Sequence, residues 1–409
     1  MKSVSILVRL GPVVAVLLAA TGTPSVAQET EVDASQSARF RFGPLRFTPS
    51  IALTDVGVDS NVFNDPDRPS QDTVGALGPA ASYWMRVGPS LVSGTASAQY
   101  LYFDKYKNQR AVNTTDALKW EVPLGRFTPF TEGKYSNAKD RTGYEIDTRA
   151  RQISQDVVIG TAVQLSGKTR VTLSGSRSRF RYDEGETFLG VDLRALDRWT
   201  NAEALQLQYR LTSQTTFVVR SEALQDRFTQ DRLRNSNSIA VLPGFEMKPT
   251  ALVSGSVLVG FRNFAPLDPT IPPYRGPVAA VSARYVLGAT RFGLKVGRDV
   301  AYSYQAEQPY YTMTDVGLDV TERITYAWDV VARASRQRLE YAVRQGLAAP
   351  TAPQLDRIAQ YGGGIGYRVG RTVRFGIDGH YFQRRSTNAT LRDFEGFRVG
   401  ASITYGLQP

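Results

Sequence analysis

Apolar and polar residues alternate along most of this chain. From Phe397 to Tyr405 every second residue is apolar, whereas the intervening residues, from Arg398 to Thr404, are charged, small or hydroxylated. A two-residue period is the pattern of a β-strand whose two faces meet different surroundings. From residue 45 onward, stretches of about 10 to 14 such residues recur, so the pattern predicts a long series of strands.

Short turns and longer polar loops separate these stretches. The short turns contain Gly, Pro, Ser or Thr, which favour tight turns. They fall at residues 87–90, 123–126, 166–169, 212–215, 248–250, 287–290, 321–323 and 369–372. Longer loops are rich in charged residues, Pro and Asn, and examples are residues 60–72, 137–151, 183–198, 265–276 and 342–356. Eight short turns and nine longer loops join eighteen strands, or sixteen or twenty if one hairpin is miscounted.

This pattern predicts an all-β fold, a single antiparallel up-and-down transmembrane β-barrel over residues 45–409. In a bilayer the apolar face contacts lipid, and closure of the sheet pairs every backbone group. The even strand count and the alternation of short turns with long loops are typical of outer-membrane barrels. A soluble β-sandwich or solenoid is the competing fold, but it would have to cover one apolar face of a very long sheet.

The N-terminal residues predict export. Lys2 and Arg9 form a positively charged region before a short apolar core at residues 10–20, and Ser25-Val26-Ala27 provides a cleavage site. Residues 1–27 are therefore expected to be a signal peptide. The apolar core is shorter than the roughly 20 residues of a spanning helix, which disfavours a membrane anchor. Residues 28–44 are expected to be a flexible periplasmic segment. The predicted location is the outer membrane of a bacterial cell.

Composition narrows the chemistry. The 409 residues include no cysteine and one histidine, His380, and the formal net charge is +11. Disulfides, thiolate metal sites and clustered histidine ligands are therefore excluded. We expect no catalytic residues, no cofactor and no nucleic-acid partner. An outer-membrane lipid hydrolase or acyltransferase is the enzymatic rival, with His380 as its base.

Charged residues are expected on the inner, water-facing side of the barrel. The candidates are Arg86, Lys119, Glu121, Glu132, Lys134, Arg210, Arg220, Glu222, Arg262, Arg284, Lys295, Asp299, Asp319, Arg333, Arg374, Asp378 and Arg398. A charged interior indicates water, and its basic excess would favour anionic solutes. The alternative is a set of cross-strand salt bridges that brace the wall and select nothing.

Aromatic residues near strand ends are expected to form girdles at the membrane interfaces. They are Tyr100, Tyr102, Tyr135, Tyr209, Tyr302, Tyr304, Tyr310, Tyr311, Tyr326, Trp328, Tyr367 and Tyr405.

The first strand and loop resemble a known family. The segment Asp59-Ser60-Asn61-Val62-Phe63, followed by Ser70-Gln71-Asp72 and then Gly78-Pro79, is similar to the opening signature of β-barrel porins of the polysaccharide-associated outer-membrane type. The resemblance implies an export-associated porin with no catalytic residues. The loop oxygens could instead hold Ca²⁺, although Asx turns explain the same residues. The chain ends at Gly406-Leu407-Gln408-Pro409, so Tyr405 would replace the terminal aromatic that the assembly machinery recognises.

The function expected from these features is passive passage or export of a hydrophilic solute or polysaccharide through a charged, water-filled lumen. Outer loops folded into the lumen would form a constriction. The alternative is a structural or surface-display barrel that acts through its extracellular loops without an open pore. Expected partners are outer-membrane lipid and lipopolysaccharide, whose phosphates suit the basic charge, the barrel-assembly machinery and polysaccharide export components.

Overall fold

The computed structural model describes residues 38–249, 252–346, 354–387 and 392–406. The expected signal peptide and most of the expected lead-in therefore lie outside the described residues. Eighteen antiparallel strands form one closed barrel. In chain order they are β2 (Leu45–Asp59), β3 (Asp72–Val87), β4 (Ser90–Phe103), β5 (Ala111–Glu121), β6 (Phe127–Asp140), β7 (Ala150–Gln164), β8 (Thr169–Tyr182), β11 (Arg198–Arg210), β12 (Thr215–Phe228), β13 (Ser236–Met247), β14 (Val253–Pro266), β15 (Tyr274–Leu287), β16 (Thr290–Tyr302), β17 (Tyr310–Arg323), β18 (Trp328–Ala342), β19 (Leu355–Val369), β20 (Val373–Ser386) and β21 (Phe394–Tyr405).

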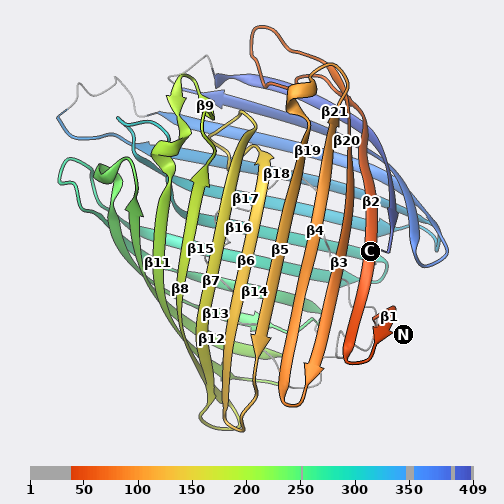
Figure 1. The fold of residues 1–409 in the computed structure, drawn as a ribbon, viewed down its shortest axis with the longest axis vertical. Coiled ribbons are helices and arrows are strands. Elements are labelled where there is room, and N and C mark those ends of the chain that lie inside the picture. The colour runs from red at the N-terminus through yellow and green to blue at the C-terminus, as the bar shows by residue number, and fades with distance from the viewer. Residues whose placement is uncertain (1–37, 250–251, 347–353, 388–391, 407–409) are drawn as a thin grey trace.

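Each strand pairs with its neighbour in the chain, and β21 closes the barrel by pairing with β2. The front and rear walls cross at an angle in Figure 1, as the tilted strands of a barrel do. Short turns lie at one end of the barrel, and loops of seven residues or more lie at the other. The described parts of the long loops contain β9 (Thr187–Phe188), β10 (Val191–Asp192) and the 3₁₀ turns η2 (Lys107–Gln109), η3 (Leu193–Leu196) and η4 (Arg232–Arg234). In the part of the chain that the structure describes, no helix is long and apolar enough to cross a membrane.

The predicted strand count is confirmed, and seven of the eight predicted short turns fall between the expected strands. The turn expected at residues 321–323 is wrong, because β17 continues to Arg323 and the chain reverses at residues 324–327. Thr325 explains the position, since its hydroxyl accepts hydrogen bonds from the backbone N–H groups of Ala327 and Trp328.

The end of the expected flexible segment contains a short strand. β1 (Phe40–Phe42) pairs with the start of β2. Phe40 and Phe42 stack on Phe47, with ring centroids 5.2 and 5.8 Å apart. These apolar contacts hold residues 40–42 against β2.

The outer surface of the barrel is apolar. Ile159, Leu318 and Ile377 lie on different strands and are 64, 55 and 60% exposed. The protein itself does not cover these side chains, so they form the surface expected to contact lipid. A soluble sandwich or solenoid would bury them.

Exposed aromatic side chains encircle the short-turn end of the barrel. They include Trp120, Phe127, Tyr209, Phe245, Tyr285, Trp328, Tyr367, Phe375 and Tyr405, all at least 36% exposed. Each lies within three residues of a strand end. This arrangement matches the aromatic girdle of a membrane interface.

Four tyrosines expected in a girdle lie elsewhere. Tyr304, Tyr310 and Tyr311 are at most 5% exposed, and the ring of Tyr302 packs against Phe228 at 4.7 Å. The pairing register gives the reason. Pairs between β15 and β16 stop at Arg298, whereas β16 and β17 stay paired as far as Tyr302. The end of β16 therefore separates from β15, while β17 stays paired with β18 up to Tyr310. Tyr304 packs among the loops, and Tyr311 packs on the wall against Tyr341.

The girdle supports one test of packing. Trp328 and Tyr367 face each other across β18 and β19, with ring centroids 4.9 Å apart. We expect a double-mutant cycle of W328A and Y367A, measured by urea unfolding from lipid vesicles, to give a coupling free energy of about 0.5–1.5 kcal/mol. A cycle of W328A with Y209A, on a distant strand, should give none. Zero coupling for the facing pair would contradict the register.

Candidate functional site

The inner wall of the barrel is charged. On β20, Arg374 and Asp378 alternate with the exposed Phe375 and Ile377, so they face the opposite side of the wall. The same alternation places all seventeen charged candidates on the inner face of their strands.

Some inner-wall charges form cross-strand networks. Arg262 contacts Glu222 at 2.5 Å and Asp299 at 2.8 Å, which joins β14 to β12 and β16. Lys119 lies 2.9 Å from Glu121 and 3.7 Å from Glu132. These ion pairs brace the wall, as expected if inner-face charges form cross-strand salt bridges.

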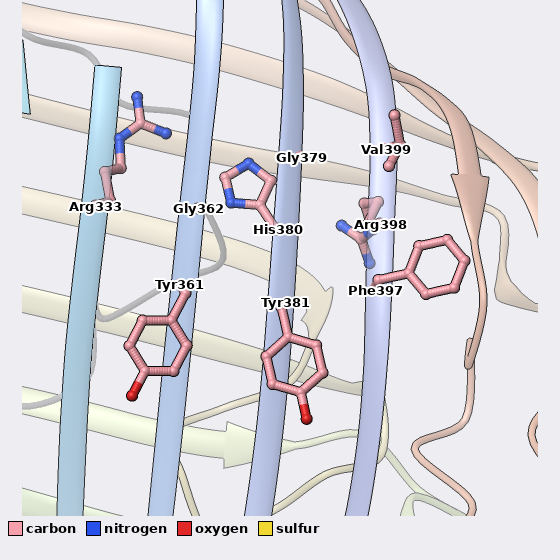
Figure 2. A pocket seen from close by; sticks show the side chains of 9 residues that line it. All are labelled: Arg333, Tyr361, Gly362, Gly379, His380, Tyr381, Phe397, Arg398 and Val399. Atoms are coloured by element: carbon pink, nitrogen blue, oxygen red, sulfur yellow. The ribbon is translucent and has the colours of Figure 1, made fainter.

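Glycines on β19 make room for the inner side chains of β20. A Cβ on Gly362 would lie 2.5 Å from Nδ1 of His380, so the imidazole ring lies over this glycine. Figure 2 shows Arg333, Gly362, His380 and Arg398 on four adjacent strands, where they form one cross-strand row and line a shallow pocket. Gly362 and Gly364 therefore make room for His380 and Asp378, and His380 is part of a packed wall row.

A basic cluster lies on the inner wall near the short-turn end. Arg291 on β16 lies in the electrostatic field of Arg284, Arg323 and Arg368. Arg368 contacts Asp329 at 2.9 Å, and Arg374 reaches the same carboxylate at 2.7 Å. Among the described residues, no carboxylate lies within 4.0 Å of Arg284, Arg291 or Arg323. This part of the wall is therefore strongly positive.

The family-like motif lies at the seam where the barrel closes. Asp59 is fully buried and contacts Arg398 of β21 at 2.6 Å. The Ser60 N–H donates to the carbonyl of Phe397, and the Asn61 amide donates to the carbonyl of Glu395. The motif thus ties the long-loop end of the first strand to that of the last strand.

The rest of the motif folds the first loop back on the barrel. Val62 is 1% exposed and packs with Val74 and Phe103, and the ring of Phe63 meets that of Tyr106 edge-on at 4.7 Å. The carboxylate of Asp72 accepts bonds from the backbone N–H groups of Thr73, Lys105 and Tyr106. Turn chemistry therefore accounts for the acidic residues of this loop. The described residues contain no group of three metal-ligating side chains.

The loop at residues 141–149 extends across the interior at the long-loop end. It joins β6 to β7, yet its contacts include β20 and the β16–β17 and β20–β21 loops. On the shorter way round the barrel, five strands lie between β6 and β20: β5, β4, β3, β2 and β21. Residues 141–149, called here the crossing loop, therefore span the lumen and narrow it.

Two arginines from the opposite side of the barrel, one on β20 and one in the β20–β21 loop, hold the crossing loop. Arg384 on β20 is fully buried, and its guanidinium donates to the carbonyls of Tyr144 and Glu145 at 3.1 and 3.0 Å. The same group forms ion pairs with Asp147 of the loop and Asp356 of β19. Arg392 donates to the carbonyl of Glu145 at 2.8 Å. Buried guanidinium groups with several acceptors make strong, directional anchors.

The carboxylate of Glu145 is buried at the centre of this contact. The Ser303 hydroxyl donates to it at 2.6 Å, and the Tyr304 N–H donates to it at 3.1 Å. Burial raises the pKa of Glu145 to about 7, an effect that Arg392 and the two hydrogen bonds only partly oppose. The side chain can therefore gain or lose a proton near neutral pH.

Apolar side chains surround the same contact. Ile146 of the crossing loop packs with Phe188, Leu193 and Leu196 of the β8–β11 loop and with Tyr304 of the hairpin tip. These residues come from three separate loops, so the long-loop end has a small hydrophobic core of its own. That core holds the crossing loop inside the barrel.

Sequence reasoning missed the residues that anchor the crossing loop. Arg384 and Asp356 follow the same inner-face alternation as His380 and Asp378, so extending the alternation to the strand ends would have found them. Glu145 and Asp147 carry no such signal, because their position depends on contacts between loops distant in sequence.

A profile of the protein family described as "Putative beta-barrel porin 2" matches residues 37–406. No curated protein matches the chain. Solved structures with similarity include a BenF-like porin from Pseudomonas fluorescens Pf-5, at 10% identity and TM-score 0.48, covering 90% of this chain and 100% of that one. The outer membrane protein opdK from Pseudomonas aeruginosa is 9% identical with TM-score 0.48, covering 88% and 98% of the two chains.

Proposed function

Because the chain belongs to this family of β-barrel porins, we propose that it forms a water-filled channel across the outer membrane, through which hydrophilic solutes pass without catalysis. The long-loop end faces the outside of the cell, and the short-turn end faces the periplasm. The observation that carries the proposal is the contrast between an apolar, exposed outer wall and a charged inner wall. Charged side chains on the inner face require water around them.

The charge of the wall supports a preference for anions. Arg284, Arg291 and Arg323 lie near the periplasmic end, and Lys295 and Arg333 extend the basic surface along the neighbouring strands. A solute that enters from either end would therefore pass a positive field. Carboxylated or phosphorylated sugars, including acidic polysaccharide chains, fit this field.

The crossing loop sets the size limit in this proposal. With the loop anchored by Arg384, small solutes pass beside it. A polysaccharide chain would thread through in an extended form or would require the loop to swing out. Export of a polymer therefore depends on the stability of the loop contacts.

Anion preference can be tested by replacing the basic cluster. In planar bilayers with a salt gradient, the wild-type channel should favour chloride over potassium. The R284Q/R291Q/R323Q variant should lower that permeability ratio about threefold, because each charge contributes on the order of 1 kcal/mol or less in water. A matched loss of three charges on the outer surface, R336Q/R338Q/R357Q, should leave the ratio unchanged. An unchanged ratio in the first variant would contradict anion preference.

The surface-display alternative is favoured by the apolar core that packs the loops together at the outer end. A barrel sealed by that core would act through its loops and carry no current. Conductance measurements on the same bilayers separate the two functions.

A further inference from the structure

The outward face of β8 changes from apolar to basic as it approaches the long-loop end. Val171 and Leu173 lie on the outer surface near the short turn, and Leu173 is 57% exposed. Two-residue alternation puts Arg177, Arg179 and Arg181 on that same outer face. Arginine facing lipid is costly within the hydrocarbon but stable at the level of charged headgroups.

A tryptophan fixes two of these arginines. The guanidinium carbons of Arg177 and Arg179 lie 4.3 and 4.9 Å from the ring centroid of Trp199 on the neighbouring strand β11. Cation–π contacts of this kind hold the guanidinium groups while leaving their N–H donors free to bind an anion. Within the described part of the chain, neither Arg177 nor Arg179 has a carboxylate within 4.0 Å.

The surroundings of this pair are positive on one side and apolar on the other. Trp199 also pairs in register with Arg227 of β12, whose guanidinium donates to the carbonyl of Ser236 at 2.7 Å. Glu203 on β11 is the acidic side chain on the side of these arginines that is nearer the short-turn end. Closer still to the short-turn end, Leu205 and Leu207 are 49 and 41% exposed on the lipid-facing wall.

We propose that Arg177, Arg179, Arg181 and Trp199, called here the β8 patch, bind a phosphate group of lipopolysaccharide. The planar fork of a guanidinium matches phosphate, and two adjacent forks match a single phosphate better than a diffuse charge does. The ligand must also have acyl chains, because exposed leucines continue the patch toward the membrane centre. A phosphorylated glycolipid of the outer leaflet combines both features at the required depth.

This binding would also fix the direction of the barrel. Lipopolysaccharide lies in the outer leaflet, so the long-loop end must face outward. The proposal depends on location in the outer membrane and not on whether the lumen conducts, and its failure would leave the channel proposal standing.

The test is a titration of fluorescently labelled lipopolysaccharide onto the purified full-length barrel in detergent. We expect R177Q/R179Q to bind about tenfold or more weakly than wild type, since it loses two charge-assisted contacts. The matched variant R126Q/K168Q removes two positive charges from the short-turn end and should bind like wild type. Heat-modifiable migration on a gel confirms that each variant is folded. If R177Q/R179Q does not fold, R177K/R179K keeps the charges without the planar fork and should bind several-fold more weakly.

Two further probes define the ligand. Dephosphorylated lipopolysaccharide should bind the wild-type barrel as weakly as the intact lipid binds R177Q/R179Q. Phosphatidylglycerol vesicles should compete poorly with the labelled lipid. Equal binding of the phosphorylated and dephosphorylated forms, or equally strong competition by phosphatidylglycerol, would overturn the assignment, as would wild-type affinity in a folded R177Q/R179Q variant.

Discussion

Replacing Arg384 with methionine is expected to release the crossing loop and to raise the single-channel conductance. The substitution keeps most of the side-chain volume but leaves the carboxylate of Asp147 without its ion-pair partner, while Asp356 retains Arg392 at 3.2 Å. Removing one partner from a buried ion pair costs about 3–5 kcal/mol. Here that cost falls on the docked position of the loop, because the barrel wall retains its strand pairing.

The measurement is current through single channels in planar bilayers at neutral pH. R384M should show larger and noisier open levels than wild type, because the loop moves in and out of the lumen. The neighbouring Arg385 faces the other side of β20 and pairs with the exposed Glu395 at 3.2 Å, so R385M should behave like wild type. Wild-type conductance in a folded R384M variant would show that Arg384 does not hold a constriction.

The conductance is also expected to depend on pH through Glu145. Its pKa in the docked loop is about 7, above the ordinary 4.5, so the docked loop binds the proton more tightly than a released loop does. Docking is therefore strongest below pH 4.5 and weakens as the pH rises through 7. The change amounts to about 3 kcal/mol over that interval. Channels should dwell longer in open levels at pH 8.5 than at pH 5.5.

E145Q tests this assignment, because glutamine imitates the protonated side chain at every pH. Its channels should lose the part of the pH dependence that Glu145 supplies. Burial also raises the pKa of Asp147 in the same loop to about 7, so the remaining pH dependence should disappear only in E145Q/D147N. Arg392, Asp356 and Tyr304 also face Glu145 and remain in the variant. H380Q is the matched control, because His380 lies on the wall away from the loop. The conductance of H380Q channels should depend on pH as it does in wild type. A wild-type profile that stays flat, or one that E145Q leaves intact, would rule out Glu145 as the titrating group.

The barrel could be predicted from sequence because its main signals are local. Two-residue alternation sets the face of each side chain, and Gly, Pro and Thr mark the turns. The turn at residues 321–323 was misplaced because Glu322 and Arg323 look like polar turn residues, whereas Thr325 makes the turn. The misplaced tyrosines, such as Tyr304 and Tyr311, show the limit of the local signal. Their position depends on which strands and loops pack together at the long-loop end.

The candidate site was predicted in part for the same reason. Residues such as Arg262 and Arg374 follow strand alternation, which places them on the inner wall. The crossing loop could not be positioned, because its contacts with Arg384 and Arg392 join segments more than 230 residues apart in the chain. The role of Asp59 at the closing seam also depends on a partner, Arg398, near the other end of the chain.

The most direct test of the central claim compares the wild-type barrel with a variant in which residues 142–148 are replaced by a short Gly-Ser linker. Both proteins are inserted into planar bilayers under the same salt and voltage. A narrowed, water-filled lumen predicts discrete currents for wild type and several-fold larger currents for the shortened loop. An absence of current from both folded proteins would mean that the lumen is closed along its length and that the barrel is not a channel.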